Sequence, residues 1–102
     1  MRSVIIRYRV KPERAEENTA LVRAVYEELA TARPEGFHYA TFRLQDGVSF
    51  VHIAFTEADD HQPLQRIAAF QRFTAGVSER CDEPPVLSEM TQVGSYGLVL
   101  HE

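Results

Sequence analysis

The dipeptide Asp46-Gly47 stands between two strand-like runs, and this arrangement constrains the fold more than any other feature of the chain. Residues 37–44 and residues 48–55 both alternate between two sets of side chains and are rich in aromatic and β-branched residues. Asp-Gly favours a two-residue hairpin of type I′, because both central positions of that turn need a positive φ. The sequence therefore predicts an antiparallel hairpin near the middle of the chain.

A strand and a long helix are predicted before this hairpin. Residues 4–10 alternate with a period of two and are expected to form the first strand. Pro12 ends that strand and suits the first turn of a helix, which Pro34 then ends. The helix is indicated by apolar residues that recur at intervals of three and four: Leu21, Val25, Leu29 and Ala32.

The segment after the hairpin has a less regular pattern. Residues 63–77 predict a second helix, although its apolar stripe is less clean than that of the first. Residues 81–85 are expected to form a loop and residues 86–93 a fourth strand. Residues 96–100 fit either a short terminal strand or a tail that reaches a partner.

The order of these elements predicts one α+β domain that spans residues 1–102. Strand-helix-strand-strand-helix-strand is the ferredoxin-like β-α-β-β-α-β order, with an antiparallel sheet. Right-handed connections place the first and third strands in the middle of that sheet and both helices on one face of it.

The two faces of the predicted sheet differ in polarity. Val51, Ile53 and Phe55 are large and apolar, so we expect their face to lie under the helices, together with Ala40, Phe42 and Leu44 and with Val4, Ile6, Tyr8 and Val10. The opposite face is mixed and includes Arg7, Arg9, Tyr39, Thr41, Arg43, Phe50 and His52. That face is too apolar for water and too polar for a dry core. We therefore expect two copies to pack sheet to sheet as a homodimer around a polar-lined cavity.

Composition narrows the classes of partner. The formal net charge of −4 disfavours nucleic acid, which needs a basic surface. The apolar run at the N-terminus is interrupted by Arg7 and Arg9 and is too short for a signal peptide or a membrane span. The expectation is a soluble, cytoplasmic protein that does not bind membranes.

Cysteine and histidine give no prediction of a metal or cofactor. Cys81 is the single cysteine, so no intrachain disulfide forms, and its acidic neighbours favour an inert thiol. The spacing of His38, His52, His61 and His101 matches no compact metal-ligand motif. No glycine loop for phosphate or a dinucleotide is present, so no cofactor is expected.

Three segments of the chain carry a resemblance to a known family. They are residues 4–12, which lead into a helix with an acidic start, residues 50–57, and residues 93–96. In order and spacing the chain resembles the dimeric α/β-barrel superfamily, and within it the antibiotic-biosynthesis-monooxygenase-like domains. The resemblance implies a ferredoxin-like subunit that forms a dimeric α/β barrel.

The resemblance also implies a function, with one alternative left open. The first hypothesis is a small cofactor-independent monooxygenase or isomerase that acts on an aromatic or polyketide-like molecule in the barrel cavity. The alternative is a non-catalytic protein of the same fold, which binds a small ligand or takes part in a stress response. A fold by itself does not distinguish them.

Candidate site residues come from the mixed face of the predicted sheet. The expected catalytic residues are His52, Arg7 and Tyr39. The ordinary pKa of a histidine lies near physiological pH, which suits His52 as a general base. The other interpretation is a structural histidine that is hydrogen-bonded at the dimer interface. The expected substrate-binding residues are Phe50, Arg43, Thr41 and Glu89.

The charged members of this set have structural interpretations as well. Arg43 beside Tyr39 suits a phenolate or carboxylate ligand, and Arg7 or Arg43 would stabilise an anion formed when His52 takes a proton. The other interpretation is a solvated or interface strand. Glu89 is expected to pair with Arg7 or Arg9, which favours a structural ion pair.

Overall fold

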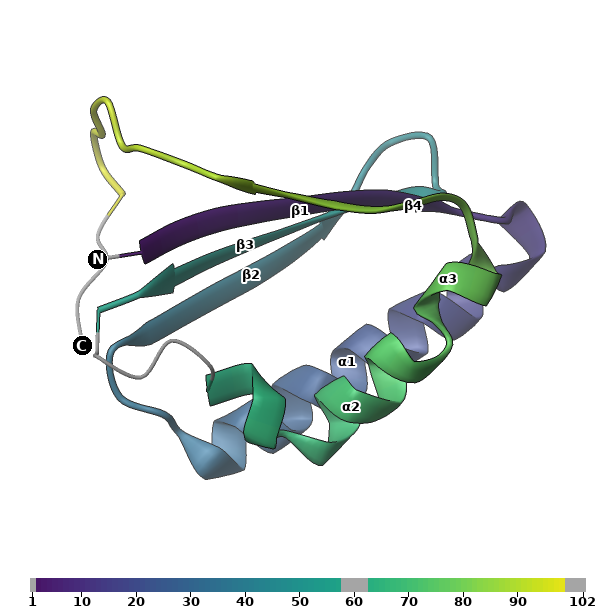
Figure 1. Cartoon of the computed structure of the whole chain (residues 1–102), viewed down its shortest axis with the longest axis horizontal. Helices are drawn as coiled ribbons and strands as arrows, with labels where there is room; N and C mark the ends of the chain where they lie inside the picture. Colours follow the sequence, from purple (N-terminus) through teal and green to yellow (C-terminus); the bar gives the residue numbers. More distant parts are fainter. Residues whose placement is uncertain (1, 58–62, 99–102) are drawn as a thin grey trace.

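A computed structural model describes residues 2–57 and 63–98 of the chain, and its centre is one four-stranded sheet (Figure 1). The strands are β1 (Arg2–Val10), β2 (Phe37–Arg43), β3 (Ser49–Thr56) and β4 (Cys81–Glu89). Their order across the sheet is β2-β3-β1-β4, and every neighbouring pair is antiparallel. The predicted α+β, ferredoxin-like order is confirmed, with the first and third strands in the middle.

The helices lie together on one side of the sheet, as expected (Figure 1). A 3₁₀ turn (Pro12–Arg14) leads into α1 (Ala15–Ala32), and the second half has a 3₁₀ turn (Pro63–Arg66), α2 (Ala68–Ala75) and α3 (Val77–Arg80). None of the helices in the described ranges is long and apolar enough to cross a membrane.

The prediction of one continuous second helix is wrong. Ile67 is extended, with φ −90° and ψ 115°, and Gly76 leaves helical geometry between α2 and α3. The break before α2 is stabilised from α1, because the Glu28 carboxylate accepts hydrogen bonds from the backbone N–H groups of Ala68 and Ala69 at 3.1 and 2.9 Å. A carboxylate at this position also suits the positive end of the helix dipole.

The central hairpin is confirmed, but its turn is not of type I′. Gly47 has a φ of 80°, whereas among the described non-glycine residues only Arg33 has a positive φ. The Asp46 carboxylate instead accepts hydrogen bonds from the backbone N–H groups of Val48 and Ser49 and from the Ser49 hydroxyl. The side chain of Asp46 thus closes a longer loop in place of a second positive φ.

The fourth strand begins earlier than predicted. The segment expected as a loop belongs to β4, and the strand ends at Glu89 rather than at residue 93. Pro84 and Pro85 lack a backbone N–H, which an edge strand such as β4 tolerates. The register also shifts there, since Val86 lies opposite Arg7 and Glu83 opposite Arg9. This irregularity accommodates both prolines.

The face assignment from the sequence is right for β1 and wrong for β2 and β3. Directly opposite residues of antiparallel strands share a face, and His52 lies opposite both Ile6 and Thr41. The helix-covered face comprises Val4, Ile6, Tyr8, Val10, Tyr39, Thr41, Phe50, His52, Ala54 and Thr56. The uncovered face comprises Ile5, Arg7, Arg9, Ala40, Phe42, Val51, Ile53, Phe55, Val86 and Ser88.

The burial of this partly polar face has a physical reason. The polar side chains of the helix-covered face are hydrogen-bonded to one another and to α1, so their burial carries little penalty. Val51, Ile53 and Phe55, which were expected under the helices, are only partly buried on the uncovered face. Phe42 is 54% exposed there and Val86 63%.

Candidate functional site

His52 lies at the centre of the helix-covered face and holds two tyrosine hydroxyls. Its side chain is buried, because α1 and α2 cover the middle of β3. The Tyr8 hydroxyl lies 2.8 Å from Nε2, and the Tyr39 hydroxyl lies 2.6 Å from Nδ1. Side chains of a strand alternate between its two faces. Tyr8 of β1, Tyr39 of β2 and His52 of β3 all lie on the helix-covered face and therefore come together.

Further hydrogen bonds extend from both tyrosines toward the helices. Asn18 on α1 donates from Nδ2 to the Tyr8 hydroxyl at 2.9 Å, and Arg80 on α3 donates from Nε to Asn18 Oδ1 at 3.1 Å. On the other side the Thr41 hydroxyl lies 3.2 Å from His52 Nδ1 and 2.7 Å from the Tyr26 hydroxyl. We call this set the His52 network: Tyr8, Asn18, Tyr26, Tyr39, Thr41, His52 and Arg80.

Burial sets the protonation states of this network. It lowers the pKa of His52 to about 4, so the imidazole is neutral at physiological pH. It also raises the pKa of the Tyr8 and Tyr39 hydroxyls far above their usual range, so both keep their hydrogens. The network is therefore a set of neutral donors and acceptors beside one buried guanidinium, that of Arg80.

Arg80 brings a positive charge to the Tyr8 end of the network. Its Nη2 donates to the Phe73 carbonyl oxygen at 2.8 Å, and its guanidinium carbon lies 5.3 Å from the centre of the Phe73 ring. Burial lowers the pKa of Arg80, because a low-polarity surrounding disfavours the charged form. A cation in this position favours electron-rich groups nearby.

A cavity of about 200 Å³ lies against this network, between the sheet and α2. We call it the helix-side cavity. Tyr8, Tyr39 and His52 supply its polar wall, and the rest is mostly apolar: Ile6, Phe70, Phe73, Val77 and Pro85, with Thr74. A smaller cavity of about 120 Å³ shares Ile6, Tyr39 and Phe70 with it, so the two adjoin. An apolar pocket with a few convergent polar groups is the usual form of a small-molecule site.

Four of the predicted site residues lie together on the helix-covered face. Tyr39, Thr41 and His52 are members of the His52 network. Phe50 lies beside it, with its ring stacked on Tyr8 at a centroid distance of 5.5 Å. They lie beneath the helices, however, and not on the uncovered face where the sequence placed them.

The three predicted charged residues lie outside the His52 network, although the guanidinium carbon of Arg43 lies 5.9 Å from the centre of the Phe50 ring. Arg43 lies at the surface, where it donates to Glu16 at 3.0 Å and to the Gly47 carbonyl oxygen at 2.8 Å. Glu89 pairs with Arg2 at 3.5 Å instead of with Arg7 or Arg9. Arg7 is on the uncovered face, so the expectation that it shares a face with His52 and Tyr39 is wrong.

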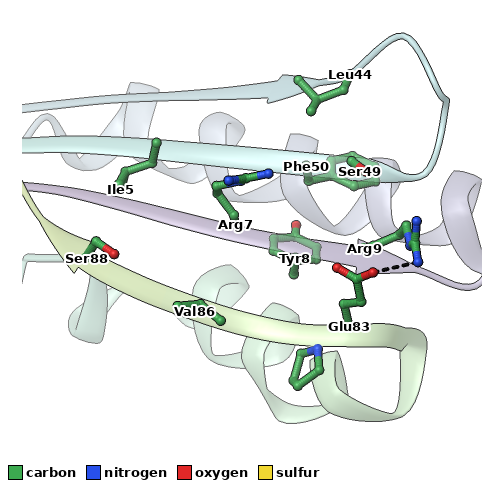
Figure 2. A pocket seen from close by; sticks show the side chains of 11 residues that line it. Ile5, Arg7, Tyr8, Arg9, Leu44, Ser49, Phe50, Glu83, Val86 and Ser88 are labelled. Carbon is green, nitrogen blue, oxygen red and sulfur yellow. Dashed lines mark ion pairs between the residues drawn. The ribbon is translucent and has the colours of Figure 1, made fainter.

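Arg7 borders a groove of about 410 Å³ on the uncovered face, which we call the sheet groove (Figure 2). Ile5 and Val86 flank it, and Arg9 forms an ion pair with Glu83 at one end. The helices lie behind the sheet in this view. The sheet groove and the helix-side cavity are therefore on opposite sides of one sheet.

Four residues of the His52 network were not chosen as site residues from the sequence: Tyr8, Asn18, Tyr26 and Arg80. Asn18 carried a usable signal, because it precedes Val22 and Val25 by four and seven positions and so interrupts the buried stripe of α1. A polar residue in such a stripe indicates a buried hydrogen bond. Arg80 carried no such signal, since the sequence around it is polar.

No group of three or more potential metal ligands occurs in the described ranges, 2–57 and 63–98. His38 contacts Glu57 at 3.1 Å, and His52 is held by its tyrosines. His61 and His101, the other histidines considered from the sequence, lie outside the described residues.

Comparison with known proteins shows a shared fold. No protein-family model matches the chain, and no curated protein matches it in sequence. Two similar solved structures are each described as a putative antibiotic biosynthesis monooxygenase. The one from Nitrosomonas europaea has a TM-score of 0.74 and 17% identity, covering 92% of this chain and 100% of that one. The one from Caulobacter crescentus has a TM-score of 0.71 and 19% identity, covering 91% and 90%.

A third structure is described only as an antibiotic biosynthesis monooxygenase. It has a TM-score of 0.66 and 24% identity, covering 92% of this chain and 100% of that one. The resemblance expected from the sequence is thus confirmed at the level of the fold.

Proposed function

We propose that this protein is a small monooxygenase-type enzyme that binds a hydroxylated aromatic molecule in the helix-side cavity. The observation that carries the proposal is His52, held between two tyrosine hydroxyls at the wall of an apolar cavity. The fold shared with structures described as antibiotic biosynthesis monooxygenases supports the type of reaction.

The polar wall suits a substrate that changes from a phenol to a carbonyl compound. Phe70 and Phe73 would pack against the ring, and the Tyr39 hydroxyl would donate to the substrate oxygen, where negative charge develops. In the reaction one oxygen atom of O₂ is added to a ring carbon. The other leaves as water with two hydrogens of the substrate, which itself supplies the electrons. The His52 network then needs only to orient the substrate and to relay its proton.

The size of the cavity favours a small substrate. Small-molecule sites usually measure roughly 300–1,000 Å³, whereas the helix-side cavity has about 200 Å³ and its neighbour about 120 Å³. We therefore propose a compound of one or two rings, rather than a larger polyketide-like molecule.

A second candidate function is ligand binding without turnover. Both ring nitrogens of His52 are already hydrogen-bonded, and burial lowers its pKa to about 4, which makes it a weak base. A protein built in this way would hold an aromatic ligand by packing and hydrogen bonds alone. An isomerase is the related case in which the network moves a proton and no oxygen is consumed.

Oxygen uptake with a panel of one- and two-ring phenols and hydroquinones tests the proposal. Wild type is expected to consume O₂ with at least one of them, and His52→Ala to lose roughly 100-fold or more in kcat/KM. His38→Ala, at a surface histidine that contacts Glu57, is the matched control and should keep its activity. Binding with no uptake and no rearranged product would establish the non-catalytic function, and no binding at all would contradict both.

We also propose that two copies pack through their uncovered faces. Val51, Ile53 and Phe55 form an apolar strip along β3 that nothing in the described chain covers, and Phe42 continues it at 54% exposure. Apolar side chains that gather on one face and stay partly exposed indicate an interaction site. A two-fold arrangement would bury the strip of each copy against that of the other and enclose the sheet groove.

A further inference from the structure

We propose that Asn18 and Arg80 fix the tautomer of His52 and thereby leave Tyr39 with the one hydroxyl hydrogen that is free for a ligand. The two residues would act as positioning residues, since neither lines the helix-side cavity. The part that concerns the ligand rests on the proposed function. The part that concerns the tautomer rests on the hydrogen bonds alone.

A count of hydrogens shows that one of them is in excess. Neutral His52 carries one N–H, and Tyr8 and Tyr39 each carry one O–H. Only two of these three hydrogens serve the contacts between the tyrosine hydroxyls and the ring nitrogens, and the Thr41 hydroxyl is a further, longer contact of Nδ1 at 3.2 Å. One tyrosine must therefore direct its hydrogen elsewhere, and which tyrosine does so depends on the tautomer of His52.

Arg80 fixes the orientation of the Asn18 amide. A guanidinium has only donors, so the Asn18 atom 3.1 Å from Arg80 Nε must be the carbonyl oxygen. The amide nitrogen then faces Tyr8 and donates to its hydroxyl at 2.9 Å. Tyr8 therefore accepts a hydrogen bond from the α1 side.

The surroundings of the two tyrosines decide where the excess hydrogen lies. The polar side-chain contacts of the Tyr8 hydroxyl are Asn18 and His52, and Asn18 already donates to it. If Nε2 also carried a hydrogen, the Tyr8 hydrogen would have no side-chain acceptor among the described residues, which is unfavourable for a buried hydroxyl. Tyr8 therefore donates to Nε2, and Nδ1 carries the ring hydrogen and donates to Tyr39.

Tyr39 can hold the excess hydrogen because a second acceptor lies nearby. The Thr41 hydroxyl lies 3.2 Å from the same Nδ1 atom. Its proximity lowers the pKa of Tyr39, although burial outweighs that effect. Tyr39 also lines the helix-side cavity. A carbonyl or phenolate oxygen of a ligand could therefore replace Thr41 as the acceptor without breaking the contact of either tyrosine with His52.

The substitution Asn18→Asp should reverse the direction of the hydrogen bonds that run from Asn18 through Tyr8 and His52 to Tyr39. A carboxylate accepts from Arg80 and also from the Tyr8 hydroxyl, so Tyr8 now donates toward α1. Its oxygen then accepts from Nε2–H, and Nδ1 accepts from Tyr39. The hydrogen that Tyr39 offered to the ligand is consumed. Ala20→Asp adds the same charge at an exposed position of α1 and is the matched control.

Nitrogen-15 NMR of the His52 ring at pH 7.5 tests the tautomer without any ligand. The wild type and Ala20→Asp should show a protonated Nδ1, and Asn18→Asp a protonated Nε2. A protonated Nε2 in the wild type would overturn the inference, even if Asn18→Asp failed to fold. An unchanged tautomer in a folded Asn18→Asp protein would also overturn it.

Binding of 1,4-naphthoquinone, whose carbonyl oxygens only accept, tests the role of Tyr39. Asn18→Asp and Tyr39→Phe should each bind it about tenfold more weakly than the wild type, the effect of one hydrogen bond. Equal affinity in all three proteins would refute the role of Tyr39. If the tautomer is as predicted but no protein binds the quinone or any tested phenol, the proposed function fails while the assignment of the tautomer stands.

Discussion

The two faces of β3 contrast in polarity, and within this strand the contrast is the reverse of the usual one. Within β3 alone, the side chains under the helices include His52 and Thr56, whereas those on the uncovered face include Val51, Ile53 and Phe55. In β3 the buried side thus carries His52, and the uncovered side carries the apolar strip.

The difference shows that a sheet can bury polar side chains when each of them is hydrogen-bonded. In residues 2–57 and 63–98, no buried side-chain nitrogen or oxygen atom is without a hydrogen-bond partner. A satisfied polar network is therefore compatible with the core. The apolar strip has no corresponding cover within the described chain, and for this reason we propose a second copy as its cover.

The largest effect should come from placing a charge on the uncovered face. Ile53→Asp would put one carboxylate per copy in the proposed interface, so dimerisation should weaken by about 4 kcal/mol, or roughly 1,000-fold. Sedimentation velocity over a range of concentrations measures this change. Ala30→Asp, on the exposed side of α1, should leave the dimer unchanged. A wild type that is monomeric at micromolar concentration would contradict the proposed interface.

The next largest effect should appear on the buried face, as acid sensitivity. The pKa of His52 is about 4 in the folded chain against an ordinary value of 6.5, so the unfolded state binds the proton first. The stability due to neutral His52 is complete above pH 6.5 and is lost as the pH falls from 6.5 toward 4. The loss amounts to about 3 kcal/mol, because one pH unit is worth about 1.4 kcal/mol.

Urea denaturation of wild type and His52→Gln across this pH range isolates the contribution of His52. The free energy of unfolding of the wild type should fall more steeply than that of the variant. His38→Gln controls for the loss of an imidazole elsewhere on the sheet. Parallel curves for the wild type and His52→Gln would mean that His52 is not held neutral by burial.

The smallest effect should come from Arg7, which the sequence placed in the catalytic set. Arg7 is exposed on the uncovered face, on the other side of the sheet from His52. Arg7→Gln should change the free energy of unfolding by less than about 0.5 kcal/mol and leave ligand binding in the helix-side cavity unchanged. A loss of turnover in this variant, measured by oxygen uptake, would move the site to the sheet groove.

The order of the elements could be predicted because it depends on local patterns. Alternation in residues 4–10 and around Asp46-Gly47 gave the strands, and Pro12 and Pro34 gave the ends of the first helix. Where the local sequence pattern gave a wrong prediction, contacts with distant parts of the chain determine the structure. The N-terminus of α2 is capped by Glu28 from α1, and the prolines of β4 are tolerated at a sheet edge.

The candidate site could be predicted only in part, because alternation groups residues without showing which group faces inward. Tyr39, Thr41, Phe50 and His52 were grouped correctly, since they share a face whichever way the sheet is turned. Their assignment to the uncovered face failed because the hydrogen bonds from Asn18 and Tyr26 cannot be read from one strand. Because of the same error, Arg7 was wrongly predicted to share a face with His52.

The Glu28 carboxylate described above links two segments that are forty positions apart in the chain. It joins α1 to the start of α2, and α2 carries Phe70 and Phe73 of the helix-side cavity. The Glu28 carboxylate therefore fixes the start of α2 relative to α1 above the sheet. Substrate selectivity would then be adjustable from a residue that never touches the substrate, because shortening Glu28 would let both aromatic rings shift together.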